Sequence, residues 1–377
     1  MVKHSYWLVL ALSGLILCGA AYFFWYMTLA HSGVGKDTGP SIESGVEEEP
    51  ITPIPLELKL DARKVALGQR LFYDTQLSHD NTISCSTCHD LTKGGADGLP
   101  YPIQRRNAGK RVKINTLTVF NSGFNFRLSW DGRAATLEDQ IDFPLQHPAE
   151  LASTWPEVIA KLDKDAAYRR DFAALYPQGI QQATIKDAIA TFERSLITPN
   201  SKFDRFLRGD KQALSDDELA GYQLFKNLGC INCHQGVNVG GNLYQKLGMV
   251  GDYFADRGHV TEVDFGRYNI TKIEADRYRF RVASLRNVAL TAPYFHDASA
   301  DTLEKAVATM GKYQLGVALS GDEIALIVKF LKTLTGEYDG KLLMQPLAIR
   351  LGEQTTLAKS LVMSGHSQGK ALQGPAS

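Results

Sequence analysis

The chain has 377 residues, of which 44% are hydrophobic, so it is long enough for two domains with buried cores. Basic and acidic residues number 41 each, and this balance argues against a nucleic-acid-binding protein. Of the five cysteines, four occur in two pairs of identical spacing. These two pairs are therefore the first candidates for a functional site.

The N-terminal segment has the composition of a membrane helix. No charged residue occurs between Tyr6 and Ala30, and this apolar run is long enough to cross a bilayer. Lys3 precedes the run and acidic residues follow it, which predicts that residue 1 lies in the cytoplasm and the rest outside. The alternative is a cleaved signal peptide with residues 28–30 as its cleavage site. We favour an uncleaved inner-membrane anchor within residues 1–30 and a periplasmic body.

Residues 31–59 are predicted to form a flexible linker, because they are rich in Gly, Ser, Pro and Glu and lack apolar periodicity. Folded structure is expected to begin near Asp61, which would cap a helix with apolar residues at helical spacing. A further helix is expected over residues 184–197. The alternating pattern of strands is scarce in the rest of the chain, and the loops are long. The sequence therefore predicts a mainly α fold.

A short pattern occurs twice. Residues 68–72 (Gly-Gln-Arg-Leu-Phe) recur as residues 221–225 (Gly-Tyr-Gln-Leu-Phe), each shortly before a cysteine pair. Ser215 and Glu218 form the signature of a capping box at the start of the second copy. A repeated unit predicts two tandem domains, residues 60–200 and residues 201–340. We assign no chemistry to the tail, residues 341–377.

Both cysteine pairs have the form Cys-x-x-Cys-His, the attachment signature of a c-type haem. The two thiols form thioethers to the haem, and the histidine binds its iron. The residues concerned are Cys85, Cys88 and His89 in the first copy, and Cys230, Cys233 and His234 in the second. A zinc site, disulfides or a thioredoxin-like pair would also use Cys-x-x-Cys, but none of them needs a histidine directly after each pair. We predict two covalent haems c, which bacteria attach outside the cytoplasm, in agreement with an exported protein.

The function of a haem depends on the group that faces its proximal histidine. A methionine ligand gives an electron-transfer centre, whereas an open face can bind peroxide. Beyond the N-terminal segment the methionines are Met249, Met310, Met344 and Met363. Met310 is the best ligand candidate, because it ends an expected helix at which Gly311 is a natural stop. The alternative is a methionine buried in the core.

The sequence resembles the bacterial dihaem cytochrome c peroxidases, together with their relative that matures the tryptophan tryptophylquinone cofactor of methylamine dehydrogenase. The resemblance covers about residues 60 to 340. It rests on the two haem motifs, on residues 130–134, 144–150, 285–287 and 293–297, and on Met310 followed by glycine.

The resemblance implies a role for several residues. Met310 would be the sixth ligand of the C-terminal haem, where electrons enter, and the haem on His89 would bind peroxide. Glu150 would be the acid–base residue, Gln140 would line the distal pocket, and Trp130 would carry electrons between the haems. Without the resemblance, a lone Glu150 is typical of the surface, and Trp130 is typical of a core. A dry pocket could nevertheless raise the pKa of a carboxyl enough for proton transfer.

The resemblance also implies a structural calcium ion. Its protein ligands would be Asn115, Thr291 and Pro293, the last two through backbone oxygens. His296 would be a structural or haem-contacting residue rather than a ligand. The resemblance further implies a homodimer.

One departure from the family concerns activation. Many members close the N-terminal haem with a histidine on the loop after the first motif, yet residues 90–146 contain no histidine. Residues 104–107 (Gln-Arg-Arg-Asn) stand where that ligand would fall. We hypothesise that the peroxide haem is open without reductive activation, as in the cofactor-maturing relative. If a sixth ligand exists, His79 and His147 are the candidates.

The sequence thus predicts a membrane-anchored periplasmic peroxidase that reduces hydrogen peroxide. The electron donor would be a small cytochrome c, a cupredoxin or a quinol-linked chain. One alternative is the oxidative maturation of side chains in a partner protein. Another is a non-enzymatic electron carrier or redox sensor, although Glu150 and Gln140 argue against it.

Overall fold

The computed structural model describes residues 49–105 and 112–344. The predicted membrane segment within residues 1–30, most of the predicted linker and the tail from residue 345 lie outside these ranges. Among the described residues, none of the helices combines the length and the apolar character needed to cross a membrane.

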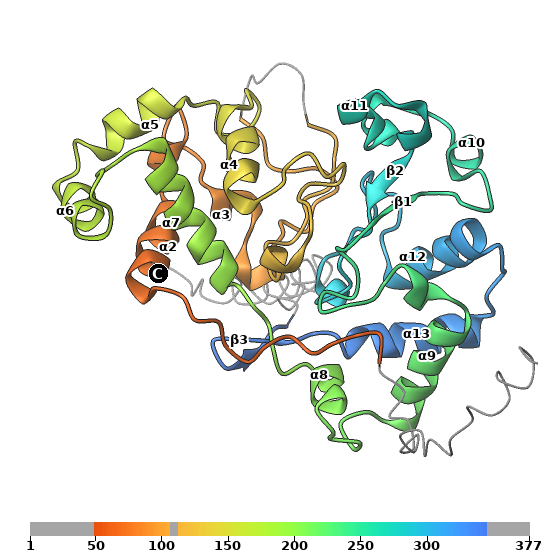
Figure 1. Ribbon diagram of the computed structural model, residues 1–377. Helices are drawn as coiled ribbons and strands as arrows, with labels where there is room; N and C mark the ends of the chain where they lie inside the picture. Colours follow the sequence, from red (N-terminus) through yellow and green to blue (C-terminus); the bar gives the residue numbers. More distant parts are fainter. Residues whose placement is uncertain (1–48, 106–111, 345–377) are drawn as a thin grey trace, which may run out of the picture. The chain divides into compact units, whose positions relative to one another are not determined.

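The described chain is mainly helical, as the sequence predicts (Figure 1). The α-helices are α2 (Ala62–Tyr73), α3 (Cys85–Cys88), α4 (Leu137–Gln146), α5 (Trp155–Leu162), α6 (Ala166–Leu175), α7 (Gln182–Ser195), α8 (Lys202–Leu207), α9 (Asp216–Asn227), α10 (Tyr253–Arg257), α11 (Tyr268–Thr271), α12 (Leu303–Met310) and α13 (Gly321–Lys332). Short 3-10 turns are η1 (Thr75–Leu77), η2 (Leu91–Lys93), η3 (Ser122–Phe124), η4 (Cys230–Asn232), η5 (Glu262–Phe265), η6 (Glu274–Asp276) and η7 (Val288–Leu290).

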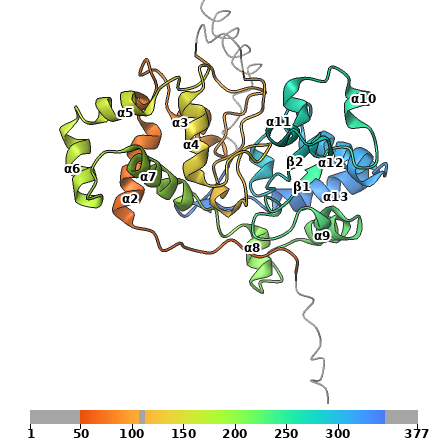
Figure 2. The ribbon, with the colours of Figure 1, turned by 45° about the horizontal axis from the view of Figure 1, so that its top comes forward.

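Strands are few and short, and they form two antiparallel pairs. β1 (Tyr244–Lys246) pairs with β2 (Arg279–Arg281), and Tyr244 lies opposite Arg281. β3 (Glu337–Tyr338) pairs with β4 (Lys341–Leu342). Figure 2 shows the pair β1–β2 close to α11 and α12.

The repeated sequence pattern corresponds to a repeated pair of helices. The side chain of Asp61 accepts a hydrogen bond from the backbone of Arg63 and so caps α2, as predicted. α2 packs along α7 so closely that a Cβ on Gly68 would lie 1.9 Å from the carbonyl oxygen of Ala188. Only glycine permits this approach of two backbones.

The second copy has the same construction. Ser215 and Glu218 form the predicted capping box at the start of α9. α9 packs along α13, and a Cβ on Gly221 would lie 2.0 Å from the carbonyl oxygen of Leu326. The glycine of the repeat therefore has the same function twice: it lets the helix before each haem motif contact a later helix of the same half.

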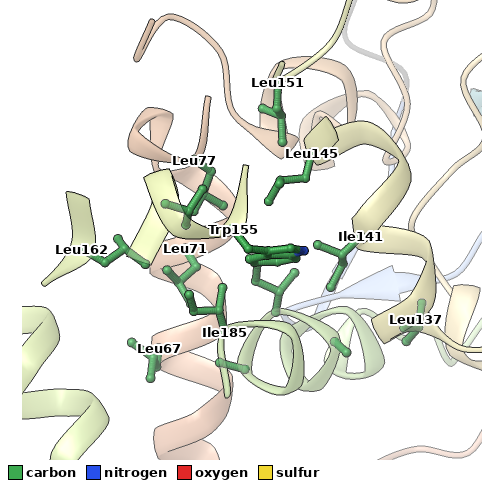
Figure 3. Close-up of a cluster of buried hydrophobic side chains, with 14 of the residues drawn as sticks. Leu67, Leu71, Leu77, Leu137, Ile141, Leu145, Leu151, Trp155, Leu162 and Ile185 are labelled. Carbon is green, nitrogen blue, oxygen red and sulfur yellow. The ribbon is translucent and has the colours of Figure 1, made fainter. Parts of the chain in front are cut away.

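Two hydrophobic cores lie on either side of the predicted boundary near residue 200. The first gathers side chains from α2, α4, α5 and α7 around Trp155 (Figure 3). In the second, the rings of Phe203, Tyr222 and Phe330 contact one another, with centroids 4.7 to 5.0 Å apart. Each helix pair of the repeat thus belongs to its own core.

Each end of the described chain packs against the opposite half of the protein. Ile51 and Ile54 are fully buried, Ile51 packs in the second core, and the backbone N–H of Ile54 donates to the Asp204 carboxylate at 3.2 Å. This part of the predicted linker is therefore fixed, because burial of two isoleucines outweighs the local composition of the segment. At the other end, Tyr338 and Leu343 pack on the first half. The predicted limits at residues 60 and 340 thus leave out residues that the cores include.

The helix that carries Met310 ends where the sequence predicts: α12 stops at Met310, and Gly311 is its C-cap. Gly311 has a right-handed φ of −54° rather than a left-handed one, and a π-helical turn, η8 (Gly311–Leu315), follows α12. The left-handed residue comes only at Gly316, with a φ of 72°. Gly311 also permits close packing, because a Cβ there would lie 2.9 Å from the side chain of Leu319.

Candidate functional site

The first haem motif forms a single helical turn. α3 contains both cysteines, and the backbone N–H of His89 donates to the carbonyl of Cys85 at 3.0 Å. The ring Nδ1 of His89 lies 3.3 Å from the carbonyl oxygen of Gly95, which can only accept a hydrogen bond. The proton is therefore on Nδ1, and Nε2 is left free for a metal. Burial lowers the pKa of His89, so that the ring is neutral, as iron ligation requires.

The second motif repeats this geometry. The backbone N–H of His234 donates to the carbonyl of Cys230, again at 3.0 Å. Its Nδ1 lies 3.3 Å from the carbonyl oxygen of Val239, and burial lowers the pKa of the ring to about 4. The two histidines thus have the same tautomer, and each offers Nε2.

The cysteines fit thioether formation better than the alternatives. All four are free thiols, and burial raises the pKa of Cys85 and Cys88 to about 12 and that of Cys230 to about 11. Across residues 49–105 and 112–344, the one cluster arranged closely enough for a metal ion is Asp264, His296 and Asp297, and it contains no cysteine.

Glu150 follows α4, close to the first motif. Burial raises the pKa of its carboxyl to about 7, although the guanidinium of Arg133 acts in the opposite direction. The charge of Glu150 in turn contributes to the raised pKa of Cys88. Glu150 is therefore within electrostatic reach of the first haem motif, unlike the surface glutamate that its sequence context alone suggests.

Gln140 and His147 belong to α4 and its C-cap, whereas His79 contacts α5. Gln140 is partly buried on α4. The side chain of His79 is 60% exposed, and its Nδ1 is 3.0 Å from Glu157. His147 follows the last residue of α4, and its Nδ1 accepts a hydrogen bond from the backbone of Ala149 at 3.1 Å. His79 therefore faces solvent and a carboxylate.

The loop in which the family's closing histidine would lie is fixed by hydrogen bonds at Gln104 and Arg105. The amide of Gln104 donates to the carbonyl of Val112 at 2.8 Å and accepts from its N–H at 2.9 Å. Arg105 makes two hydrogen bonds to Asp80, at 2.9 and 2.8 Å. Residues 106 and 107 lie outside the described ranges.

A junction between the two halves brings several predicted residues together. The indole Nε1 of Trp130 donates to the carbonyl of Asn115 at 2.9 Å, and the N–H of Asn115 donates to the carbonyl of His296 at 2.8 Å. Trp130 and Met310 both pack on the same buried cluster, formed by Leu247, Tyr253, Phe254 and Phe280. Thr291 and Pro293, the other predicted calcium ligands, belong to the loop that leads to His296.

His296 is held by groups that the sequence did not reveal. Its Nε2 lies 2.7 Å from the Asp264 carboxylate, and its ring stacks on Phe280 with centroids 4.4 Å apart. Arg257 bonds both Asp264 and Asp297. This arrangement supports the structural role expected for His296, because the Nε2 atom of its ring already pairs with the Asp264 carboxylate.

Two buried ionisable side chains, Glu193 and Arg281, were not predicted from the sequence. The Oε2 atom of Glu193, on α7, has no hydrogen-bond partner among the described residues, and burial raises its pKa to about 8. The Nη1 atom of Arg281, on β2, likewise has no partner there, and burial lowers its pKa to about 10. No local pattern distinguishes these two residues from exposed ones, because burial depends on distant segments.

Comparisons with known proteins agree with this geometry. Residues 62–212 match the family model described as di-haem cytochrome c peroxidase. The chain is 48% identical to the cytochrome c peroxidase Ccp of Escherichia coli (strain K12) over 80% of its own length, and it spans 64% of that protein. It is 44% identical to the cytochrome c551 peroxidase of Nitrosomonas europaea, covering 77% of this chain and 85% of the relative.

A solved structure is also similar. The crystal structure of a MauG-like protein associated with microbial copper homeostasis aligns with a TM-score of 0.65 and 31% identity. The alignment covers 78% of this chain and 95% of that one. On these matches and on its two haem motifs, the chain belongs to the di-haem cytochrome c peroxidase family.

Proposed function

We propose that this protein reduces hydrogen peroxide to water with electrons from a small redox protein. One peroxide, two protons and two electrons give two molecules of water. The donor would be a cytochrome c or a cupredoxin, or else a quinol-linked chain. The body would lie in the periplasm, held by an inner-membrane anchor within residues 1–30.

The chain would hold two covalent haems. Cys85 and Cys88 would bind one haem with His89 as its proximal ligand, and Cys230, Cys233 and His234 would bind the other. The thiols are free, and each histidine has Nε2 available. When bound, the haem on His89 supplies the redox chemistry that cleaves peroxide. Met310 would be the sixth ligand of the other haem.

The observation that carries this proposal is the place of Glu150: its carboxyl is partly buried within electrostatic reach of Cys88 in the first motif, and burial raises its pKa to about 7. Near neutral pH this carboxyl is partly ionised, so it can take a proton from the near oxygen of peroxide and return it to the far oxygen. Gln140, on α4, would help to orient peroxide. Arg133 stabilises the ionised form of Glu150 and so limits the rise in its pKa.

Electrons would pass between the haems by way of Trp130. Its packing on the same buried cluster as Met310 supports this role, because that cluster contains residues of the second half. The hydrogen bond from Nε1 to Asn115 holds the indole in one orientation. A calcium ion bound by Asn115, Thr291 and Pro293 would stabilise the same junction, and two copies of the chain would form a dimer.

We further propose that the haem on His89 is open in the oxidised protein. The exposure of His79 and the absence of histidine from residues 90–146 support this. Electron paramagnetic resonance of the oxidised holoprotein should show high-spin iron. The variants His79→Ala and His147→Ala should leave that signal unchanged, whereas a His147→Ala variant that alone converts low-spin to high-spin iron would identify a closing ligand.

The experiment that tests the main proposal is rapid mixing of the oxidised holoprotein with one equivalent of hydrogen peroxide, followed by turnover with reduced cytochrome c. Fast loss of peroxide and continued oxidation of the donor would support the proposal. Peroxide loss with slow donor oxidation would favour oxidation of side chains in a partner. No reaction before or after reduction would indicate an electron carrier or sensor.

A further inference from the structure

Arg281 is a buried cation that pairs with no carboxylate in the described part of the chain. Its relative exposure is 4%, and Nη1 makes no hydrogen bond to any described residue. Its Nε donates to the carbonyl of Ser129 at 3.3 Å, which is a weak contact. Burial is the main cause of its lowered pKa, and the only group that acts against burial is the phenol of Tyr244, which is not an anion at neutral pH. A buried guanidinium without an anion is costly, so an anionic partner is expected.

A second buried arginine five residues along the chain shows what a complete set of contacts looks like. Arg286 is 1% exposed and pairs with the Asp204 carboxylate at 2.8 Å. Its Nε and Nη2 donate to the carbonyls of Val237 and Thr52, each at 2.9 Å. Within residues 49–105 and 112–344, a carboxylate therefore pairs with one buried arginine of this segment and none pairs with the other.

The neighbours of Arg281 indicate which anion would pair with it. Its backbone N–H donates to the carbonyl of Trp130 at 2.8 Å, so it adjoins the residue proposed to lie between the haems. Four residues further on, the backbone N–H of Leu285 donates at 3.2 Å to the carbonyl of Val239, the same carbonyl that faces the His234 ring. On the partner strand, the amide of Gln245 lies 3.8 Å from the sulfur of Cys233. The backbone of Arg281 thus contacts Trp130, and other residues of the same β1–β2 segment contact the second haem motif.

Each haem c carries two propionate carboxylates. A guanidinium suits such a group, because its planar set of donors matches both carboxylate oxygens. We propose that Arg281 binds a haem propionate at the junction between the two halves. This inference rests on the two haems of the proposed function. The contacts of β2 favour the haem on His234, and the haem on His89 is the other source of the same group.

The test uses the full-length holoprotein and the midpoint potentials of its two haems, which absorption spectra resolve during a redox titration. Oxidised haem carries one more positive charge than reduced haem, so a nearby cation favours reduction. The variant Arg281→Met should lower the midpoint potential of the haem whose propionate it binds. The matched control is Arg279→Met on the same strand, where Nε bonds the carbonyl of Ala275, and it should leave both potentials unchanged.

The outcomes distinguish which haem supplies the propionate, and they show whether Arg281 binds a propionate at all. A lowered potential at the His234 haem supports the favoured source, and one at the His89 haem supports the same chemistry from the other source. Unchanged potentials in an Arg281→Met protein that retains both haems by mass would overturn the proposal. If that variant does not incorporate haem, Arg281→Lys keeps the charge but loses the planar set of donors.

For Arg281→Lys we expect a shift in the propionate bending band of the resonance Raman spectrum, and bands identical to those of the wild type would also overturn the proposal. These readouts do not depend on peroxide turnover. Failure of the proposed peroxidase activity would therefore be distinguished from failure of this inference.

Discussion

The indole Nε1 of Trp130 donates a hydrogen bond to the backbone oxygen of Asn115 across 2.9 Å. The N–H of Asn115 in turn donates to His296, on a loop of the second half. Two residues predicted for different tasks, electron transfer and calcium binding, are therefore joined directly. A substitution of either residue should therefore alter the position of the other.

We expect Trp130→Phe to slow electron transfer between the haems while both haems remain attached. The change removes the indole and its hydrogen bond, and it should lower the free energy of unfolding by about 1 kcal/mol. Flash-induced reduction of one haem, followed by its reoxidation, measures the transfer rate. Trp155→Phe is the matched control, because the Nε1 of Trp155 also donates a hydrogen bond, to Asp142 at 2.8 Å, but within the first core. It should affect stability alone, and equal transfer rates in the two variants would contradict a role for Trp130.

The variant Glu150→Gln should lower kcat/KM for peroxide by roughly 10²- to 10⁴-fold, because it cannot accept the proton. In the wild-type protein the ionised carboxylate is the active form, so kcat/KM should rise as the pH increases through about 7, and this limb should vanish in the variant. The folded-state pKa lies above the ordinary value of 4.5, so the contribution of Glu150 to stability falls as the pH rises from 4.5 to about 7.

Glu157→Gln is the control for the same chemical change. Glu157 pairs with Lys161 and His79 on the surface side of α5, and its pKa is lowered rather than raised. Wild-type turnover is expected of this variant at every pH. Wild-type turnover in Glu150→Gln would remove Glu150 from the proposed chemistry.

A calcium ion at the junction should be removable by a chelator. Treatment of the holoprotein with EGTA should slow transfer between the haems, and added calcium should restore it. Asn115→Ala should weaken calcium binding by about tenfold or more, which corresponds to roughly 1.4 kcal/mol. Metal analysis after dialysis measures this loss. Asn121→Ala removes another buried asparagine, which bonds Thr198 instead, and it should leave the calcium content unchanged.

The two glycines of the repeat should be equally intolerant of a methyl group. Gly68→Ala and Gly221→Ala each place a Cβ about 2 Å from a carbonyl oxygen of the partner helix, and each should cost at least ~1–3 kcal/mol of stability. Gly321→Ala is the control, since a Cβ at the start of α13 meets nothing within 4 Å. Denaturant unfolding of the holoproteins compares the three. A tolerated Gly221→Ala beside a damaging Gly68→Ala would argue against a shared construction.

Much of the site could be predicted because its signals are local. The spacing of Cys85, Cys88 and His89, and its repetition from Cys230, needs only one helical turn, and the structure has such a turn at both places. The caps Asp61 and Ser215 are likewise local, since each side chain bonds a backbone N–H within three residues. The end of α12 at Met310, with Gly311 as its C-cap, is confirmed as well, although Gly311 is right-handed and packs closely against Leu319.

Other features depend on segments that are far apart in the chain. The fixing of Ile51 and Ile54 on the second half follows from Asp204 and from a core that forms around Phe203. The raised pKa of Glu150, the burial of Arg281 and the contact between Trp130 and Asn115 depend equally on distant segments.

By itself, the sequence determined the haem attachment motifs, the helix starts and the repeat, because each depends on residues within a few positions of one another. The tertiary structure decided which side chains are buried away from water, which charged groups find partners and which predicted residues are in contact. Desolvation and long-range contact create these properties, and neither exists until distant segments have packed together.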